Sequence, residues 1–284
     1  MMNEENIGLE IAKETVKEVA KDVYADGGRP IVKPTGELVG LIPRAIKAAL
    51  SPLEKWIMQR EYNIAETEKL LELKLQNVNP ENIEPPEPYV AVPALQYISY
   101  CMDNDELRDM YANLLANSMN KVVKNGVHPG FVEIIKQLSP DEAKMLRYIY
   151  TNTYVPTMGL KVYKKTGGYL SFFESFTNIT ELCECEDIGE NENYVDNLVR
   201  LGLIIKPNDK YLISEEKYEP LKNHSFIVKQ KEDFEKMDAV SKVEYVKGML
   251  ELTSFGKKFC GICLLTQNVI DVDLEESRDN NDKL

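Results

Sequence analysis

The chain contains 284 residues, of which 43% are hydrophobic and 29% are charged. This composition is typical of a folded globular protein and excludes the collagen-like, low-complexity and wholly disordered classes. The 34 Lys and Arg residues are outnumbered by 47 Asp and Glu residues, which gives a formal net charge of −13. A polyanion such as DNA therefore meets net repulsion unless the basic residues gather on one face. The length predicts one large domain or two ordinary ones.

The sequence predicts neither secretion nor membrane insertion. No basic segment followed by an apolar run precedes Lys13, so no secretory leader is expected. The longest apolar stretch, residues 38–50, is interrupted by charged residues and is shorter than the ~20 residues of a membrane span. Five cysteines, an odd number, favour reduced thiols over a disulfide framework. We therefore expect a cytoplasmic protein.

The first half of the chain is predicted to be helical. Residues 1–28 contain an amphipathic helix, residues 7–24, which ends at a pair of glycines. Residues 29–138 are expected to form a helical domain. Within it, residues 51–54 (Ser-Pro-Leu-Glu) offer a cap, a proline at the first helical position and a capping box. They predict the start of a long helix that reaches about residue 76.

Three further helices are expected in this domain. Four prolines among residues 77–88 predict an exposed, extended connector. A mostly apolar helix within residues 89–102 is expected to begin near Pro93. Residues 103–106 (Asp-Asn-Asp-Glu) predict a cap and an acidic first turn for the next helix. Its apolar residues recur at helical spacing: Leu107, Met110, Tyr111, Leu114 and Leu115. A short helix over residues 131–138 follows.

A second domain, residues 139–268, is predicted to begin with another Ser-Pro-x-Glu helix start. Residues 194–205 indicate a helix that stops at Gly202 and becomes a strand, because glycine supplies a left-handed cap and branched residues follow it. Residues 248–259 indicate a returning strand that leads into a last short helix. This order of helices and paired strands is typical of a winged helix.

Two parts of this second half depart from a simple winged helix. The insertion from about residue 208 to 246 is longer than a wing needs and is predicted to carry a helix around residues 233–241. Residues 269–284 are predicted to be a disordered acidic tail. The predicted fold class is therefore mainly α, with a helical N-terminal domain followed by an α+β, winged-helix-like C-terminal domain.

The charge of the expected recognition helix argues against DNA binding. Residues 181–196 contain seven acidic side chains and neither Lys nor Arg, whereas a DNA-reading helix meets phosphate with basic residues. A winged helix that contacts protein is the favoured interpretation. The compact basic run of Lys161, Lys164 and Lys165 is interpreted as a solvated loop.

The cysteines leave one metal question open. Four thiols from Cys183, Cys185, Cys260 and Cys263 would suit tetrahedral zinc. The second pair also fits the apolar face of a closing helix, where cysteine acts as a small hydrophobic side chain. We favour this interpretation, so no metal site is predicted, but the sequence does not decide whether the four thiols meet. Cys101 is expected in the core.

No catalytic motif is recognisable, and no enzyme activity or cofactor is expected. The two histidines, His128 and His224, have no nucleophile motif beside them, and His128-Pro129 is better suited to begin a helix. Phosphate-binding loops, dinucleotide fingerprints and His-Glu-x-x-His are absent from the sequence. The carboxylates of Asp105, Glu106 and Asp109 are explained by helix capping. No catalytic, cofactor-binding or metal-binding residue is therefore assigned.

Several segments together resemble the bacterial abortive infection alpha family, a domain of unknown function. They are residues 29–40 (from Arg-Pro to Gly-Glu-Leu-Val-Gly), 50–56 with Trp56, 105–116 (Asp-Glu-Leu-Arg-Asp-Met-Tyr-Ala-Asn-Leu-Leu-Ala) and 128–142 (from His-Pro-Gly-Phe to Ser-Pro-Asp-Glu). The resemblance covers roughly residues 25–265. It implies a phage-defence or prophage-borne protein with a helical N-terminal half. The family pattern offers no catalytic residue to transfer.

These observations lead to one preferred function and two alternatives. The preferred function is abortive infection by a non-enzymatic protein that contacts a phage or host protein, with homo-oligomers expected. The first alternative is a winged-helix transcription regulator, which requires five lysines to gather on one face: Lys206, Lys210, Lys217, Lys222 and Lys229. The second is a membrane-acting effector that uses residues 38–56 as an interfacial helix. Duplex DNA and membrane are the less favoured partners.

Overall fold

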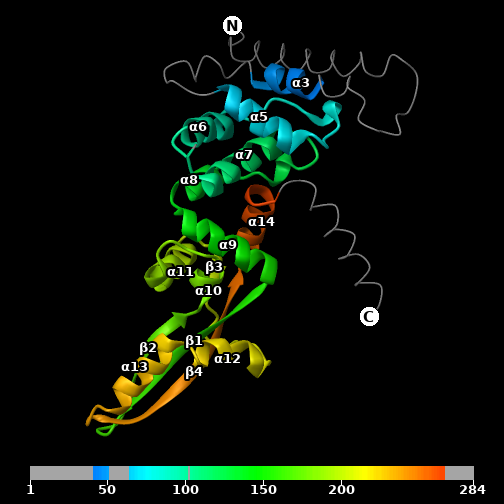
Figure 1. Ribbon diagram of the computed structural model, residues 1–284. Helices are drawn as coiled ribbons and strands as arrows, with labels where there is room; N and C mark the ends of the chain where they lie inside the picture. The colour runs from blue at the N-terminus through cyan, green and yellow to red at the C-terminus, as the bar shows by residue number, and fades with distance from the viewer. Residues whose placement is uncertain (1–40, 51–63, 102, 266–284) are drawn as a thin grey trace, which may run out of the picture. The chain divides into compact units, whose positions relative to one another are not determined.

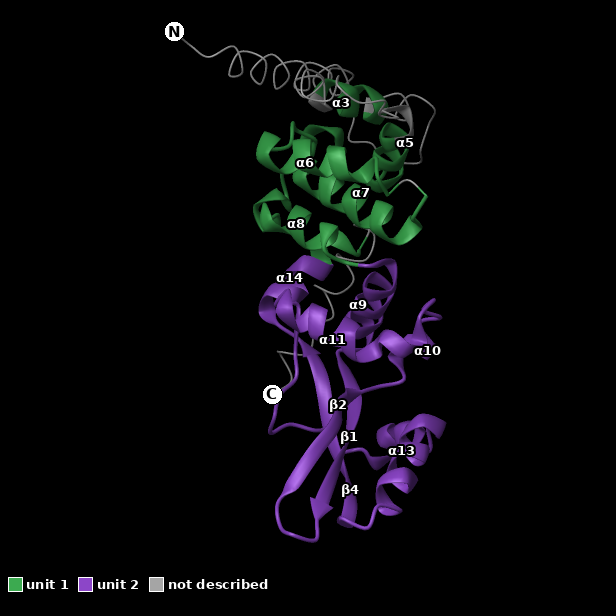
Figure 2. Ribbon diagram, turned by 90° about the vertical axis from the view of Figure 1, so that its left-hand side faces the viewer, with its two compact units in different colours: residues 1–138, 261–284 green, residues 139–260 purple. Residues whose placement is uncertain are grey.

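The protein is described here by a computed structural model that covers residues 41–50, 64–101 and 103–265 (Figure 1). The described residues divide into two compact units (Figure 2). Unit 1 contains those up to Leu138 and those from Gly261 onward, and unit 2 is Ser139–Cys260. The predicted helix over residues 7–24, the predicted helix start at 51–54 and the predicted acidic tail at 269–284 lie outside the described residues.

Unit 1 is built around a helix that is buried on nearly all sides. This helix, α7 (Asp105–Met119), contacts α5, α6 and α8, and each of its ten residues from Met110 to Met119 is buried. A helix that is apolar around most of its circumference has to occupy the centre of a core. The surrounding elements are α3 (Leu41–Leu50), α5 (Ile64–Leu75), η2 (Pro80–Asn82), α6 (Pro88–Ile98), η3 (Lys124–Gly126) and α8 (Gly130–Lys136).

The start of α7 is set by the cap predicted from the sequence. The Oδ1 atom of Asn104 accepts a hydrogen bond of 2.9 Å from the backbone N–H of Leu107. Asp105 and Glu106 occupy the first turn, where negative charge is favourable to the helix dipole. The prediction of a capped, acidic start at residues 103–106 is therefore confirmed.

Two buried asparagines of α7 bind the end of the last helix, α14 (Ser254–Cys263). Asn113 Nδ2 donates to the carbonyl of Cys263 at 3.0 Å, and Asn117 Nδ2 donates to that of Ile262 at 2.8 Å. The last carbonyls of a helix lack partners within it, so these side chains satisfy them. The chain thus belongs to unit 1 again from Gly261, earlier than the predicted domain end at residue 268.

The segment before α6 is packed, and the predicted exposed connector at residues 77–88 is wrong. Val78 and Ile83 are buried, Ile83 forms a β-bridge with Asn120, and Glu84 N–H donates to Met119 O at 2.8 Å. The apolar side chains in this proline-rich segment add to the core of unit 1. The prolines fix the path of the backbone while these side chains are buried.

Helix α6 also begins earlier than expected. It starts at Pro88 and contains Pro93 within it, whereas the sequence predicted a start near Pro93. Pro88 takes the first helical position, where a missing N–H has no intrahelical partner to lose. The buried residues of the helix lie on both sides of Pro93, including Val90 and Leu95, and their packing outweighs the helix-breaking tendency of proline.

Unit 2 starts with α9 (Pro140–Asn152), whose cap was predicted. The Ser139 hydroxyl accepts from the N–H of Glu142 at 3.1 Å, and the Glu142 carboxylate accepts from the N–H of Ser139 at 2.6 Å. This reciprocal pair is a capping box. The helices α10 (Ile179–Leu182) and α11 (Asn191–Arg200) follow later in the chain, with the short η4 (Ile188–Glu190) between them.

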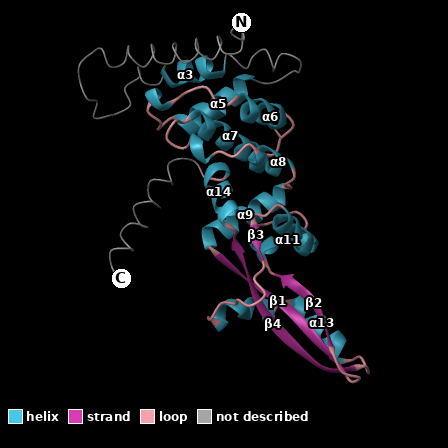
Figure 3. Ribbon diagram, turned by 180° about the vertical axis from the view of Figure 1, so that it is seen from behind, coloured by secondary structure: helices cyan, strands magenta, loops and turns pink. Residues whose placement is uncertain are grey.

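The strands of the described residues all belong to unit 2 and form one antiparallel sheet (Figure 3). Its order is β2-β1-β4-β3, formed by β1 (Tyr154–Lys164), β2 (Tyr169–Phe176), β3 (Ile204–Ile205) and β4 (Val240–Leu252). Gly202, with φ of 71°, ends the helical segment before β3, and Ile204 pairs with Leu252. The predicted helix-to-strand change at Gly202 and the returning strand before the last helix are confirmed.

The hairpin of β1 and β2 was not anticipated. Gly167 and Gly168 both have positive φ, 94° and 74°, which a tight turn requires and glycine adopts without steric cost. β4 is also much longer than the predicted strand and pairs with β1 over nearly its whole length. The fold is thus mainly helical with a four-stranded antiparallel sheet. A winged helix in the strict sense stays a prediction.

The predicted insertion covers one face of this sheet. It contains η5 (Glu215–Tyr218), α12 (Glu219–Lys222) and α13 (Ser225–Glu235). The insertion carries a helix of its own, as predicted, but its predicted place around residues 233–241 is wrong, because α13 ends at Glu235 and β4 begins at Val240. Branched residues of β4 pair across the sheet instead, as Val243 does with Val162. The core beneath the insertion is formed by Met158, Leu160, Val162, Phe176, Tyr218, Leu221, Ile227 and Val243.

Candidate functional site

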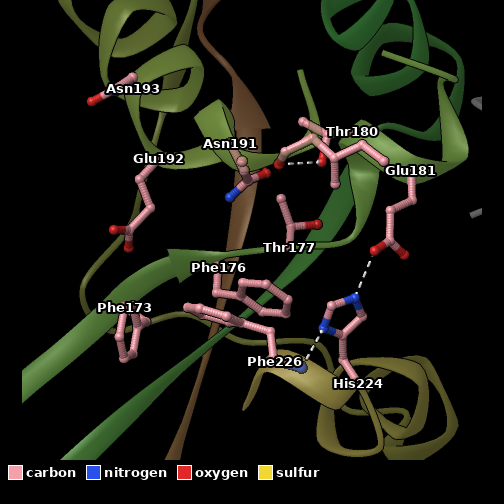
Figure 4. Close-up of a pocket in the computed structure, with 12 residues that line it drawn as sticks. Phe173, Phe176, Thr177, Thr180, Glu181, Asn191, Glu192, Asn193, His224 and Phe226 are labelled. Atoms are coloured by element: carbon pink, nitrogen blue, oxygen red, sulfur yellow. Dashed lines mark hydrogen bonds and ion pairs between the residues drawn. The ribbon is translucent and has the colours of Figure 1, made fainter. Parts of the chain in front are cut away.

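A cavity of about 390 Å³ lies within unit 2, where the end of β2 meets α10, the start of α11 and the start of α13 (Figure 4). This volume is within the usual range for small-ligand sites, roughly 300–1,000 Å³. We call it the β2–α13 cavity. It is lined by Phe173, Phe176, Thr177, Thr180, Glu181, Ile188, Gly189, Asn191, Glu192, Asn193, His224 and Phe226.

An irregularity in β2 places the first aromatic residue of this lining. Met158 of β1 pairs with Phe176 and Leu160 pairs with Phe172, so β2 carries extra residues at this point. Within this bulge Phe173 has φ of 55°, a left-handed conformation that is rare for residues other than glycine. Gly159 lies opposite, where an added Cβ atom would be only 3.1 Å from Glu174 Cα. Bulges and strained residues of this kind concentrate at functional sites.

Aromatic rings form one side of the cavity. The rings of Phe176 and Phe226 stack with centroids 5.4 Å apart, and Phe173 meets Phe226 edge-on at 5.0 Å. The imidazole of His224 lies 4.9 Å from the Phe176 ring. Such contacts are worth about 0.5–1.5 kcal/mol beyond the burial of the rings. They hold flat apolar surfaces together from two segments that are distant in sequence.

His224 connects this aromatic side to the acidic segment. Its Nδ1 atom accepts from the N–H of Phe226 at 3.3 Å and caps α13, while Nε2 lies 2.7 Å from Glu181 Oε1. An acceptor at Nδ1 requires the neutral tautomer that carries its proton on Nε2, which then donates to the carboxylate. The pair therefore fixes the imidazole plane and ties α13 to α10.

Two buried oxygens in the cavity lining have no hydrogen-bond partner. They are Thr177 Oγ1 and Asn191 Oδ1, from residues that are only 1% and 5% exposed. The Asn191 Nδ2 atom makes one long bond of 3.4 Å to the carbonyl of Ser175. An unsatisfied buried polar group costs about 1–3 kcal/mol, so each such atom calls for an explanation. By contrast, the hydroxyl of Thr180 donates to Ile188 O at 3.4 Å.

Carboxylates flank the cavity on two sides. Figure 4 shows Glu192 and Glu181 at opposite edges of the lining. Loss of hydration and the neighbouring Asp196 carboxylate raise the pKa of Glu192. Asp196 in turn pairs with Lys206 at 3.0 Å. Among the residues that line the cavity there is neither Lys nor Arg, so the site suits neutral or cationic molecules.

The predicted acidic segment, residues 181–196, is largely exposed. Among its exposed side chains are the acidic ones of Glu181, Glu184, Glu186, Asp187, Glu192 and Asp196. Two apolar side chains stand beside them, Leu182 at 54% and Ile188 at 52% exposure. We call this the acidic surface. It shares Glu181, Ile188 and Glu192 with the cavity lining.

Asp141 holds the backbone of the acidic surface in place. Its Oδ2 atom accepts from the N–H groups of Glu186 at 2.9 Å and Asp187 at 3.2 Å, and from the hydroxyl of Tyr194 at 3.2 Å. Lys144 Nζ lies 3.2 Å from Oδ1. Burial by itself would raise the pKa of Asp141, but these hydrogen bonds outweigh it and hold the pKa below its usual value.

Burial favours the neutral, protonated form of the cysteine thiols. Burial and the neighbouring Cys185 raise the pKa of Cys183 to about 12, and burial followed by Asp141 raises that of Cys185 to about 11. Cys260 and Cys263 are buried in α14. Within the described ranges, no three side chains of His, Cys, Asp or Glu are grouped in a way that could hold a metal ion.

The remaining sequence candidates take structural positions. Of the five lysines required by a DNA-binding face, three pair with carboxylates: Lys206 with Asp196, Lys210 with Glu251, and Lys222 with Glu215 and Glu219. Lys161 Nζ lies over the ring of Tyr169, 3.7 Å from its centroid. His128 Nδ1 accepts from the N–H of Gly130 at the start of α8.

The membrane candidate, residues 38–56, is described only in part. Its described residues form α3, in which Ala45 and Ile46 are buried while Arg44 and Lys47 are exposed. The buried pair adds to the core of unit 1. In the described part of the chain, each helix is too short or too polar to cross a membrane.

Most of the cavity lining escaped the sequence analysis. His224 was considered only as a catalytic base, and the aromatic residues were not singled out. One signal was available: Phe172, Phe173 and Phe176 fall within eight positions after the Gly167-Gly168 turn. The sequence did not indicate that these residues line a cavity. The cavity depends on the bulge in β2 and on Phe226, which is distant in sequence.

The comparisons with known proteins show one family. The sequence profile of a family described as Abortive infection alpha matches residues 59–263, more than half of the 284 residues. A solved structure of an uncharacterized protein from the hydrocarbon-degrading marine bacterium Alcanivorax borkumensis SK2 is similar at 16% identity and a TM-score of 0.34, over 48% of this chain and 92% of that one. No curated protein matches the chain. From the extent of the profile match, the chain belongs to the abortive infection alpha family.

Proposed function

We propose that the protein defends bacteria against phage by abortive infection and that it acts by contacting a phage or host protein through its acidic surface. Membership of the abortive infection alpha family supports the defence role. The observation that carries the mechanism is the exposure of Leu182 and Ile188 among acidic side chains in residues 181–196. Apolar anchors within a polar rim are typical of protein interfaces.

Charge identifies the kind of partner that suits this surface. Exposed carboxylates favour a protein segment that carries Lys or Arg together with apolar side chains, because opposite potentials steer association and penalise wrong partners. Asp141 supports this role, since it fixes the N–H groups of Glu186 and Asp187 and so orders the surface before any partner binds. A pre-ordered surface loses less conformational entropy on binding.

The same charges weigh against a transcription regulator. A DNA-reading surface gains its affinity by placing Lys and Arg on phosphates. Here Lys206, Lys210 and Lys222 are each paired with a carboxylate. In a gel-shift experiment at low salt we expect no binding of duplex DNA. Tight, salt-sensitive binding would contradict the present proposal and favour the function of a transcription regulator.

The decisive experiment combines phage infection with charge reversal. Cells that express the protein are expected to form fewer plaques and to die at high phage dose. The variant Glu184→Lys/Glu186→Lys should restore plaque formation to that of cells without the protein. Neither carboxylate is required by the contacts of Asp141, which uses the backbone of Glu186. A reversal variant that still protects would contradict the role of the acidic surface.

A matched control distinguishes the effect of changing the acidic surface from the effect of changing the net charge of the protein. Asp209→Lys/Glu216→Lys makes the same change of charge at two exposed positions outside residues 181–196. This control is expected to protect as well as the unaltered protein.

Light scattering of the purified chain tests the expected homo-oligomer. A homo-oligomer predicts a mass of at least two copies of the chain.

A further inference from the structure

The β2–α13 cavity has an aromatic wall that suits a flat molecule. Phe176 and Phe226 stack with an interplanar angle of 24°, and the imidazole of His224 adjoins them, 4.9 Å from Phe176. Figure 4 shows these rings on one side of the lining, with Thr177 directly after Phe176 in the chain and Asn191 beyond it at the start of α11. An aromatic ring placed against the cavity-facing side of this wall would gain offset-stacked or edge contacts.

The unpartnered oxygens define which hydrogen bonds such a molecule has to supply. Asn191 Oδ1 can only accept, so it requires a donor such as a ring N–H or an exocyclic amine. Thr177 Oγ1 can donate or accept. The bond that holds the Asn191 amide, 3.4 Å to Ser175 O, is longer than the usual 2.9–3.0 Å. The amide can therefore turn toward the cavity without losing a strong interaction.

The charges around the cavity exclude phosphate as part of the ligand. Glu181 and Glu192 stand at opposite edges, and the lining residues include neither Lys nor Arg. The nearby Lys206 is already engaged by Asp196 and by the hydroxyl of Ser175 at 2.7 Å. A phosphate at either edge would face a carboxylate without a compensating cation.

We propose that the β2–α13 cavity binds a planar nitrogen heterocycle that carries N–H donors and no phosphate, the chemistry of a nucleobase or an unphosphorylated nucleoside. The ring lies against the cavity-facing side of the aromatic wall formed by Phe173, Phe176, Phe226 and His224. Its N–H groups satisfy Asn191 Oδ1 and Thr177 Oγ1 once these two buried side chains turn toward the cavity. This site adjoins the protein contact proposed above, because Glu181, Ile188 and Glu192 belong to both surfaces. Ligand binding therefore also stiffens one edge of the acidic surface.

Calorimetric titration of the full chain with adenine, adenosine and guanosine tests the proposal, with AMP as the phosphorylated probe. At least one of the three unphosphorylated probes is expected to bind at one site per chain. AMP should bind roughly tenfold more weakly than adenosine, because its phosphate approaches Glu181 or Glu192. Absence of binding by all three probes at millimolar concentration would overturn the proposal, as would tighter binding of AMP than of adenosine.

Substitutions of Asn191 and Thr177 test whether the ligand binds in the cavity. Asn191→Leu removes the acceptor, and Thr177→Val removes the hydroxyl with almost no change of shape, so it remains informative even where the first variant fails to fold. We expect each to weaken binding about fivefold or more. Thr151→Val is the matched control, because that hydroxyl lies outside the cavity lining and donates to backbone carbonyls of Arg147 and Tyr148, and its affinity should stay within about twofold.

Unchanged affinity in both Asn191→Leu and Thr177→Val would place the ligand elsewhere and overturn the site. The measurement uses purified protein and no phage. Its failure is therefore distinguishable from failure of the proposed defence function, which the plaque experiment with Glu184→Lys/Glu186→Lys reports independently.

Discussion

The centre of unit 1 and the β2–α13 cavity of unit 2 use buried asparagines in different ways. In α7, Asn113 and Asn117 donate to the carbonyls at the end of α14 and so close the core. In unit 2, Asn191 makes one long bond and leaves its oxygen without a partner, beside Thr177 in the same condition. Asn113 Oδ1 also lacks a partner, but it does not line a cavity of about 390 Å³ as Asn191 does.

Buried polar groups that have a hydrogen-bond partner in the fold thus differ from those that are available to a ligand. A buried amide that satisfies a helix end contributes to stability, and its removal leaves carbonyls unpaired. An unpartnered oxygen in a cavity lowers stability until something bonds to it. The two regions should therefore respond differently to substitution, from a large loss in unit 1 to a small gain at the cavity.

The largest effect is expected in the core of unit 1. Leu114 of α7 is fully buried, so Leu114→Ala removes apolar contacts and leaves a void. We expect a loss of about 2–5 kcal/mol in the free energy of unfolding, measured by urea denaturation followed by circular dichroism. The exposed Leu73 of α5 is the matched control, and Leu73→Ala should change stability by less than about 0.5 kcal/mol. Equal losses in the two variants would contradict a core centred on α7.

The second effect concerns Asp141, whose carboxylate accepts hydrogen bonds from several donors in unit 2. Asp141→Asn removes the charge that the Glu186 and Asp187 amides and Lys144 stabilise. We expect a loss of about 2–3 kcal/mol at pH 7, since hydrogen bonds to a charged group are worth more than neutral ones. The exposed Asp209→Asn is the control and should have little effect.

The loss from Asp141→Asn should depend on pH. The folded pKa of Asp141 lies below its ordinary value of 3.8, so the ionised form is favoured in the folded state. The stability that this charge contributes is complete above about pH 4 and disappears as the pH falls through the folded pKa. The difference in unfolding free energy between the two proteins should therefore shrink from pH 7 to pH 3. A difference that grew toward acid pH would have the wrong sign for this account.

The bulge that forms the cavity is tested by Gly159→Ala. The added Cβ atom would lie 3.1 Å from Glu174 Cα and 3.2 Å from Phe172 O, both backbone atoms that have little freedom to move. We expect a loss of about 1–2 kcal/mol in thermal or urea unfolding, because overpacking forces the backbone to shift. Ser171→Ala, on the neighbouring exposed position of β2, is the control. A neutral Gly159→Ala would show that the bulge tolerates displacement.

The smallest expected change in the free energy of unfolding is that of Thr177→Val, and its sign is informative. Thr177→Val removes an unpartnered hydroxyl and should raise the free energy of unfolding by up to ~1 kcal/mol in the absence of ligand. Thr180→Val removes a hydroxyl that donates to Ile188 O, and should lower it by about 0.5–1.5 kcal/mol. Differential scanning calorimetry compares the two. A stability loss in both variants would remove the contrast between satisfied and unsatisfied groups.

Several features of the fold could be predicted because their causes are local. The cap at Asn104, the capping box of Ser139 and Glu142, and the stop at Gly202 each depend on residues within a few positions. Packing overrode local preference in other places. Val78 and Ile83 are buried in a proline-rich segment, and Pro93 lies inside α6. Such outcomes depend on neighbours that the sequence pattern does not identify.

The sequence by itself determined the helix ends at Asn104, Ser139 and Gly202, the helical character of the first half and the acidity of residues 181–196, since these follow from residue type and short spacing. Only the tertiary structure decided that β1 pairs with both β2 and β4, that a bulge directs Phe173 toward Phe226, and that Thr177 and Asn191 end with unpartnered oxygens. A cavity is the space left between segments distant in the chain, and its polar groups are defined by which partners fail to reach them.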